Sequence, residues 1–404
     1  MSSRYTIAMF VIAVCLLAVA SGIFEPTFNN YVDATFHVTA SQRGNLELPR
    51  EFPGFMVAAL AGAFFFLGEA NLAVIAACLV GLGMFGLAAF ANQSHQFAMM
   101  VAFMVVWSTG AHLAMPVTQS LALAVSKQRR EGAKLGMIGS AASLATIVGA
   151  GIVWLNFKVL NLSYSRVFLA GTAAAGLAAL TFAAFKLRLR KAPHGKRPRL
   201  VFRKRYRLYY VLSVLYGARK QLFITFGPWV LIRIYHQQPQ TFALLWIIST
   251  AIKVFLLPLV GRLIDEIGEQ RVLMADCVLL LAICLAYAFA GDVLPPEAAF
   301  VVVCGAYVID LVLFPVQMAR ATYLSKIAEN RADISGTLGL GVSIDHAVSI
   351  PAAILGGYLW QACDNHRPVF LLAAGVALVT FFASSLIRTP AHAESHGAER
   401  PAAR

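Results

Sequence analysis

Long apolar stretches alternate with short polar segments along almost the entire chain. A membrane-spanning helix needs about 20 apolar residues to cross about 30 Å of hydrocarbon, and about twelve stretches meet this requirement. Several connections between them are short enough to be turns. The pattern predicts an all-α membrane protein with transmembrane helices at 6–33, 43–67, 72–92, 97–125, 132–155, 165–186, 207–236, 240–262, 271–290, 297–326, 333–360 and 366–387.

The composition agrees with this prediction. The 404 residues are 59% hydrophobic and 13% charged, whereas a soluble domain has about 45–50% apolar and about 25% charged residues. The net charge of +14 is concentrated in loops, so its expected partners are membrane lipids, and no nucleic acid is expected. The six cysteines show no metal-ligand spacing, and no metal or cofactor is expected.

A strongly basic segment divides the chain into two apolar halves. Residues 186–207 read KLRLRKAPHGKRPRLVFRKRYR, and a segment this charged cannot enter hydrocarbon. The predicted organisation is an N-terminal six-helix bundle over 1–187, a basic cytoplasmic linker over 188–206 and a C-terminal six-helix bundle over 207–388. Residues 389–404, rich in Ala, His, Glu and Pro, are expected to form a disordered cytoplasmic tail.

Lys and Arg residues predict the orientation of the helices. They gather in alternate loops, together with the linker and the two ends of the chain, while the intervening loops hold few of them. Basic loops remain cytoplasmic. We therefore expect a multi-pass protein of a bacterial-type inner (plasma) membrane, with both termini in the cytoplasm.

The second half repeats the first. At a shift of 199 residues, the pair Pro116-Val117 corresponds to Pro315-Val316, and Ser126-Lys127 corresponds to Ser325-Lys326. Two parallel repeats of six helices around a central linker are the plan of one large class of transporters. The repeat therefore favours transport over catalysis.

One loop carries a family resemblance. Residues 261–271 read GRLIDEIGEQR, which resembles the GxxxDxxGxxR signature of the major facilitator superfamily and lies at the same place, between helices eight and nine. The helix count, the repeat and the linker extend this resemblance over the whole chain. It implies two pseudo-symmetric six-helix bundles and a cytoplasmic latch that gates the transporter, formed here by Gly261, Arg262, Asp265, Gly268 and Arg271.

The latch has a plainer alternative, a charged turn that only obeys the topology rule. In the family, the acid of this loop attracts a neighbouring helix end and its arginines pair across the junction of the halves. The first half departs from the pattern, because residues 62–71 read GAFFFLGEAN and lack the Asp and the basic positions. A matching latch in the first half is therefore in doubt.

Charged residues inside the spans are the main functional candidates, because each costs roughly 2.5–3.5 kcal/mol on insertion scales. Helix two carries Glu47, Arg50 and Glu51, and spacings of three and four place Glu47 on one face with both others. We predict proton coupling at Glu47 and Glu51 and gating at Arg50. The alternative is an internal ion pair that only neutralises itself.

Helix seven carries two adjacent cations, Arg219 and Lys220, which point about 100° apart on a helix and cannot share one partner. At least one should face the interior, and both are predicted to bind substrate, together with Lys253 of helix eight. Helices one, four, seven and ten line the cavity in the resembled family. That resemblance adds further candidate substrate contacts, Asn29, Trp107, Gln119 and Gln317.

The other buried acids are candidates for carrying protons, because carboxylates in a low dielectric and their histidine neighbours can exchange protons near neutral pH. The alternatives are a structural ion pair between Lys253 and an aspartate, and a histidine at His112 that only fills the core. The candidates for proton coupling are Glu25, Asp310, Asp345 and His346.

These observations predict a secondary active transporter with alternating access, coupled to protons and carrying a small anionic or zwitterionic organic solute. The alternative is a proton-coupled exporter of lipophilic or cationic drugs, whose acids would bind the substrate. No phosphate-binding loop or catalytic motif is found, so ATP-driven transport and enzyme activity are not expected. A membrane sensor or scaffold would need an output domain. We expect a monomer.

Overall fold

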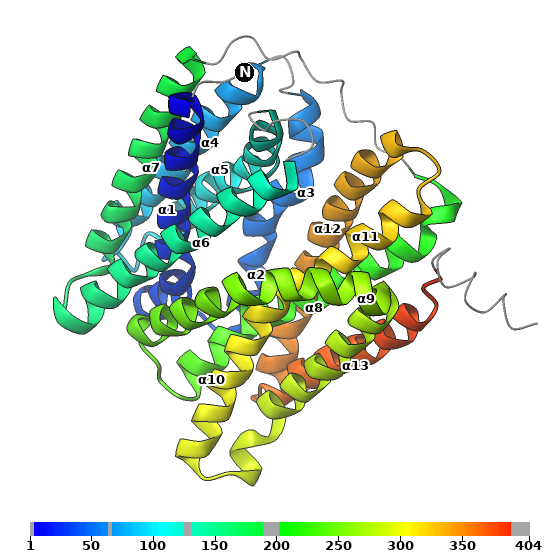
Figure 1. The fold of residues 1–404 in the computed structure, drawn as a ribbon. Coiled ribbons are helices and arrows are strands. Elements are labelled where there is room, and N and C mark those ends of the chain that lie inside the picture. The colour runs from blue at the N-terminus through cyan, green and yellow to red at the C-terminus, as the bar shows by residue number, and fades with distance from the viewer. Residues whose placement is uncertain (1–3, 64–66, 125–130, 189–201, 389–404) are drawn as a thin grey trace, which may run out of the picture.

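The computed structural model describes residues 4–63, 67–124, 131–188 and 202–388. These segments are almost entirely helical, and no strand occurs among them (Figure 1). Most of the predicted basic linker and the whole predicted tail lie outside the described residues.

Each half supplies six crossings of the membrane. In the first half these are α1 (Arg4–Phe36), α2 (Ala40–Asn45) with α3 (Glu47–Ala63), α4 (Glu69–Phe90), α5 (Phe97–Ala124), α6 (Glu131–Trp154) extended by the π-helix η2 (Leu155–Val159), and α7 (Tyr164–Arg188). In the second half they are η3 (Lys204–Tyr206) with α8 (Arg207–Arg233), α9 (Pro239–Val293), which makes two crossings, α10 (Pro296–Leu313) with η4 (Phe314–Gln317) and α11 (Met318–Ile327), α12 (Arg331–Cys363) and α13 (Arg367–Ser385). The predicted fold class, twelve spans in two six-helix bundles, is confirmed.

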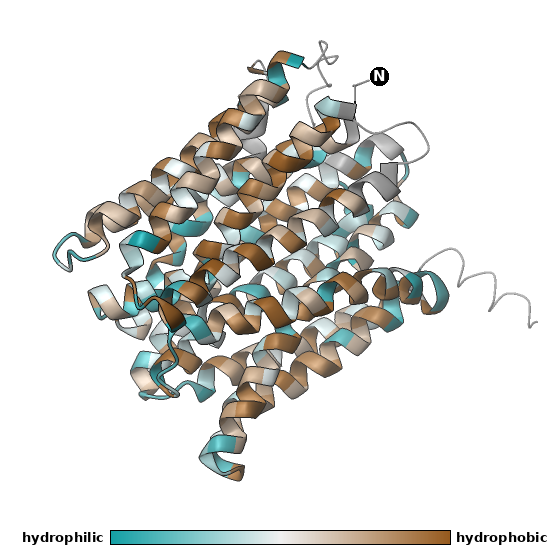
Figure 2. Cartoon of the chain, turned by 60° about the vertical axis from the view of Figure 1, so that its left-hand side comes forward, coloured by the Kyte–Doolittle hydropathy of each residue, from teal (hydrophilic) through white to brown (hydrophobic). Residues whose placement is uncertain are grey.

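Two crossings fall short of the length and apolar character of a membrane span, α3 because its described part has only 17 residues and α8 because it carries charge. In the described part of the chain, nine helices are long and apolar enough to cross a membrane. The crossings outside this set are α2 with α3, which holds Glu47 and Arg50, and α8, which holds Arg219 and Lys220. Figure 2 shows polar residues gathered at helix ends and connections, with apolar residues along the helices between them. The four charged side chains of these two crossings are nevertheless buried among neighbouring helices.

Helices eight and nine are joined more closely than the sequence predicts. The expected spans 240–262 and 271–290 belong to one run, α9, which is interrupted only at Gly268, where φ is 84° and ψ is 160°. This conformation is essentially restricted to glycine. The polar residues expected to form a loop extend the helix instead, because Asp265 and Glu266 are exposed there and need no turn to reach water.

The two halves meet closely at the end of the molecule where α1 ends and α2 begins, which we call the far side. The opposite end, where α7 ends and α8 begins, is the linker side. On the far side α2 packs against α12. A Cβ atom on Gly44 would collide with the carbonyl of Ala353, and one on Gly357 would lie 2.6 Å from the carbonyl oxygen of Ala40. Bare backbone on each helix permits this contact.

Polar contacts reinforce the far side. Arg233 at the end of α8 forms a 2.8 Å ion pair with Asp33 of α1. The Asn30 side-chain amide donates a 2.8 Å hydrogen bond to the carbonyl of Gln237 in the α8–α9 connection. Both contacts join one half to the other, so the structure is closed at this end.

The described end of the basic linker contacts protein. Arg203 forms ion pairs of 2.8 Å with Glu329 and 2.9 Å with Asp333 near the α11–α12 connection, and the Tyr206 hydroxyl donates a 3.1 Å hydrogen bond to Asp333. The sequence analysis expects lipid headgroups as the partners of these cations. In the structure Glu329 and Asp333 bind Arg203 in place of headgroups, because both acids lie beside the start of α8.

Candidate functional site

Three carboxylates and two guanidiniums meet where α1, α2 and α3 come together. Glu47 is fully buried and accepts hydrogen bonds of 2.6 Å from Arg43 and 3.0 Å from Arg50. Arg50 also lies 3.6 Å from Glu25 and 3.9 Å from Glu51. We call these five residues the α3 charge cluster. It contains one carboxylate more than it has guanidiniums.

The sequence analysis did not name Arg43 as a candidate. The residue is 1% exposed and belongs to the cluster. Its position four residues before Glu47 was the available signal, because that spacing places the two on one helix face. Asn29, a predicted substrate contact, instead accepts a 2.8 Å hydrogen bond from Arg43 and orients it.

The adjacent cations of α8 have separate acid partners. Arg219 forms a 2.9 Å ion pair with Asp310 of α10, and Lys220 forms a 3.1 Å ion pair with Asp345 of α12. The prediction that they cannot share a partner is confirmed. The alternative of a Lys253–aspartate pair is wrong, because α8 lies against α12 and its two cations reach both aspartates first.

Lys253 on α9 has no carboxylate within 4 Å among the described residues, and its ammonium lies 5.5 Å from the centre of the Trp246 ring. The Trp246 indole donates a 3.1 Å hydrogen bond to the Tyr307 hydroxyl of α10. Glu25 of α1 lies within electrostatic range of Tyr307, and its side chain is 30% exposed. Glu25 is therefore a weakly paired acid on α1 and Lys253 a cation without a close acid on α9, and no ion pair joins the two within the described residues.

The seam between the halves is bridged at mid-depth. The Glu51 carboxylate of α3 lies 2.7 Å from Nδ1 of His346 on α12. The His346 ring also packs edge-on against the ring of His112 from α5, with 4.8 Å between the ring centres. Ser108 lies 3.0 Å from Nδ1 of His112 and donates a hydrogen bond to the carbonyl of Arg50. The structure therefore brings His112 into the seam, beside two predicted proton-coupling residues.

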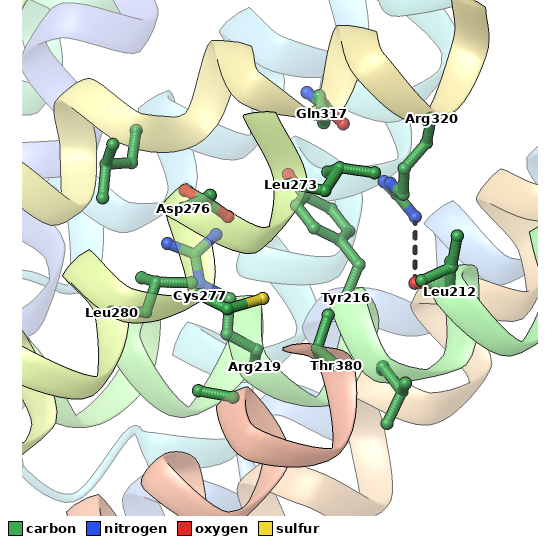
Figure 3. A pocket seen from close by; sticks show the side chains of 13 residues that line it. Leu212, Tyr216, Arg219, Leu273, Asp276, Cys277, Leu280, Gln317, Arg320 and Thr380 are labelled. Carbon is green, nitrogen blue, oxygen red and sulfur yellow. Dashed lines mark hydrogen bonds between the residues drawn. The ribbon is translucent and has the colours of Figure 1, made fainter. Parts of the chain in front are cut away.

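A small cavity lies inside the second half, between α8, α9, α10 and α13 (Figure 3). Its volume of about 30 Å³ has room for a water molecule. The Arg219 guanidinium points toward Asp276, and Arg320 covers the Tyr216 ring at 3.8 Å from its centre. Gln317 also lines this cavity. The sequence analysis missed Asp276, an acid in a span, although it met the criterion used for the other candidates.

Two of the remaining predicted substrate contacts lie apart from these groups. Trp107 is buried and stacks on Phe24 with 3.4 Å between ring centres. Gln119 is exposed on α5. Within the described part of the chain, neither side chain forms a hydrogen bond or cation–π contact with the charged groups of the seam.

The predicted latch is anchored by a residue outside the signature positions. Arg262, Asp265 and Arg271 are exposed and form no ion pair within the described residues. Glu269, the residue after the Gly268 break, is 1% exposed and forms a 2.6 Å ion pair with Lys326 of α11. Glu269 therefore ties this connection to its own half, and among the described residues Arg262, Asp265 and Arg271 form no ion pair across the halves.

A helical fold of two repeated bundles, with charged side chains gathered at and beside their junction, is the plan of one class of membrane transporters. The family model of the Major Facilitator Superfamily matches residues 10–349. The chain therefore belongs to the Major Facilitator Superfamily.

Solved transporters share the fold at low sequence identity. The nucleoside transporter NupG is 14% identical with a TM-score of 0.73, covering 95% of this chain and 98% of that one. The D-xylose-proton symporter is 12% identical with a TM-score of 0.70, covering 96% and 98%. A bacterial homologue of the human lysosomal transporter Spinster, in an inward-facing state, is 12% identical with a TM-score of 0.70, covering 95% and 98%. No curated protein sequence matches this chain.

Proposed function

We propose that this chain is a secondary active transporter that alternates access between the two sides of the membrane, is driven by protons and carries a small organic zwitterion or anion. The excess carboxylate of the α3 charge cluster carries the proposal. With a neutral His346, the cluster holds three negative and two positive charges. A net charge is costly in a low dielectric, so a bound proton would balance it.

Glu25 is the acid that fits this role best. Arg50 is 3.0 Å from Glu47 but 3.6 Å from Glu25, so protonation of Glu25 leaves the Arg50–Glu47 pair intact. Glu25 is also more exposed than the other acids of the cluster, whose side chains are at most 7% exposed. A proton can therefore reach Glu25 without separating the halves.

Replacing Glu25 by glutamine tests the coupling. In proteoliposomes with an imposed pH gradient, we expect the wild-type chain to concentrate its substrate and Glu25→Gln to lose this accumulation. Exchange of labelled for unlabelled substrate should persist, because it needs no net proton movement. The control is Glu297→Gln, which changes an exposed acid at the start of α10. Accumulation by Glu25→Gln at the wild-type level would contradict the role of this residue.

The substrate class is inferred from the unpaired cation. An anion that binds Arg219 or Lys220 must compete with an aspartate, whereas Lys253 has no such competitor within 4 Å in the described part of the chain. The Trp246 ring beside Lys253 offers an aromatic surface for the organic part of the solute. Together with the acid on α1, Lys253 favours a zwitterion.

The variant Lys253→Met distinguishes a carrier of anions or zwitterions from an exporter of cationic drugs. The substrate is first identified by a thermal-shift screen of small metabolites and drugs at two pH values. Hydrogen bonds to charged groups contribute about 1.5–3 kcal/mol, so we expect the KM of an anionic or zwitterionic substrate to rise about 10- to 100-fold. The control Lys158→Met removes an exposed cation from η2. A cationic substrate whose KM is unchanged in Lys253→Met would favour the exporter.

A further inference from the structure

Three side chains with metal-ligating atoms meet at the seam of the two halves. They are Glu51 from α3, His112 from α5 and His346 from α12, and one ligating atom from each lies within 4.8 Å of the other two. The first two belong to one half and His346 to the other. The sequence analysis expects no metal, because the cysteines show no metal-ligand spacing. These three residues are far apart in the sequence, and only the fold brings them together.

The imidazole of His112 is held in the form that a metal requires. Its Nδ1 lies 2.9 Å from the Ser108 carbonyl oxygen, which accepts only a proton-bearing nitrogen. The proton on Nδ1 leaves the lone pair of Nε2 free. Nε2 has no hydrogen-bond partner among the described residues. Such an orienting contact on the other ring nitrogen is typical of histidines that ligate metals.

Space for the two rings is provided by a glycine. A Cβ atom on Gly54 would lie 2.7 Å from Nε2 of His112 and 2.7 Å from Cε1 of His346. Any larger residue at this position would displace both rings. The bare backbone of α3 thus lets imidazoles from opposite halves converge beside the carboxylate of Glu51, one turn earlier on the same helix.

The nearby cations do not occupy the Glu51 carboxylate. Lys220 lies 3.1 Å from Asp345, and Arg50 lies 3.0 Å from Glu47. Each cation therefore has a closer acid partner of its own. Glu51 is held by the proton that it shares with Nδ1 of His346 at 2.7 Å, so a metal ion that binds both groups replaces this hydrogen bond and releases the proton to water.

We propose that Glu51, His112 and His346 form a binding site for a divalent transition-metal ion of the Zn²⁺ type. Two imidazoles and one carboxylate are a ligand set for Zn²⁺ that leaves a fourth position for water or solute. Because the ligands come from both halves, the complete set exists only while the halves are closed as in this structure. Bound metal therefore clamps this state and inhibits transport.

The size of the clamping effect follows from linkage. A ligand that binds one state only, at 100 times its dissociation constant, favours that state about 100-fold. Inhibition of transport rests on the proposed function, whereas metal binding does not. Measuring metal binding and transport separately therefore shows whether the metal site or the proposed function has failed.

The binding test uses the full-length protein purified in detergent without a histidine tag. Co²⁺ is titrated while its visible absorption is recorded, because four-coordinate cobalt absorbs far more strongly than the hydrated ion, and Zn²⁺ is then added as competitor. We expect one Co²⁺ per chain, displaced by Zn²⁺. His112→Ala, His346→Ala and Glu51→Gln each remove one ligand and should each weaken Co²⁺ binding about 10-fold or more.

Two controls address the other histidines. His95→Ala changes an exposed residue between α4 and α5, and the double variant His392→Ala with His396→Ala changes the tail; both should bind Co²⁺ as the wild type does. Absence of the cobalt absorption in the wild type would overturn the site, as would binding that persists in His112→Ala and His346→Ala or disappears with the tail histidines. Thermal unfolding without metal checks that each variant is folded. If His346→Ala is not folded, His346→Gln is used in its place.

Inhibition is measured in the proteoliposome assay with and without Zn²⁺. Transport by the wild type should fall as Zn²⁺ occupies the site, and transport by a folded His112→Gln variant, which lacks one ligand, should be insensitive to it. Equal inhibition of both would overturn the clamping role. If neither chain transports but the wild type binds Co²⁺, the proposed function fails and the metal site stands.

Discussion

Glu47→Gln is expected to destabilise the protein by about 3–5 kcal/mol, the cost of removing one partner of a buried ion pair. Glu47 is fully buried and binds two guanidiniums, Arg43 and Arg50. Glutamine retains the shape but not the charge, so Arg43 and Arg50 both lose the carboxylate that lies nearest to them. The measurement is the apparent melting temperature of the purified protein in detergent, together with its yield from membranes.

Glu266→Gln is the matched control, because it makes the same change at an exposed position of α9. It should melt with the wild type. Adding Arg43→Gln to Glu47→Gln should recover part of the loss, since the remaining Arg50 still has Glu25 and Glu51 nearby. If Glu47→Gln alone melts at the wild-type temperature, the α3 charge cluster is not the structural element described here.

Arg219→Met is expected to have an effect of similar size, about 3–5 kcal/mol, because it leaves Asp310 buried without its 2.9 Å partner. Arg188→Met, at an exposed position at the end of α7, serves as the control for loss of an arginine. Thermal unfolding in detergent measures the difference. The single variant cannot by itself separate a structural role of Arg219 from substrate binding.

The double variant Arg219→Met with Asp310→Asn makes that separation. It removes both charges of the pair, so we expect stability to return toward that of the wild type. We also expect substrate binding to return, because Lys253 is proposed to hold the substrate charge. A double variant that is as stable as the wild type but binds no substrate would make Arg219 the substrate ligand, as the sequence analysis predicts.

The fold could be predicted from the sequence because membranes impose a simple rule. A spanning segment must satisfy its own backbone hydrogen bonds, so apolar length alone locates most helices. The basic segment around 186–207 and the repeat then give two bundles. The exception is the connection at Gly268, where the residue before it remains helical and the break is confined to one glycine.

The candidate site could be predicted only as a set of residues. Charges inside the spans identified Glu47, Arg50 and Glu51 correctly as neighbours, since local helix spacing decides their contacts. The partners of Arg219 and Lys220 depend on how α8 is rotated against α10 and α12, and spacing along one helix does not contain that information. The convergence of His112 on His346 likewise depends on packing between halves.

The glycine contacts between α2 and α12 have one more consequence. Closure on the far side is made largely by main chain against main chain, at Gly44 and Gly357, while the charged groups that would recognise a solute are side chains deeper in the molecule. Mutations that alter solute preference can therefore accumulate during evolution without changing the main-chain contact between α2 and α12. A laboratory that seeks new specificities from this scaffold can randomise the interior and leave the two glycines untouched.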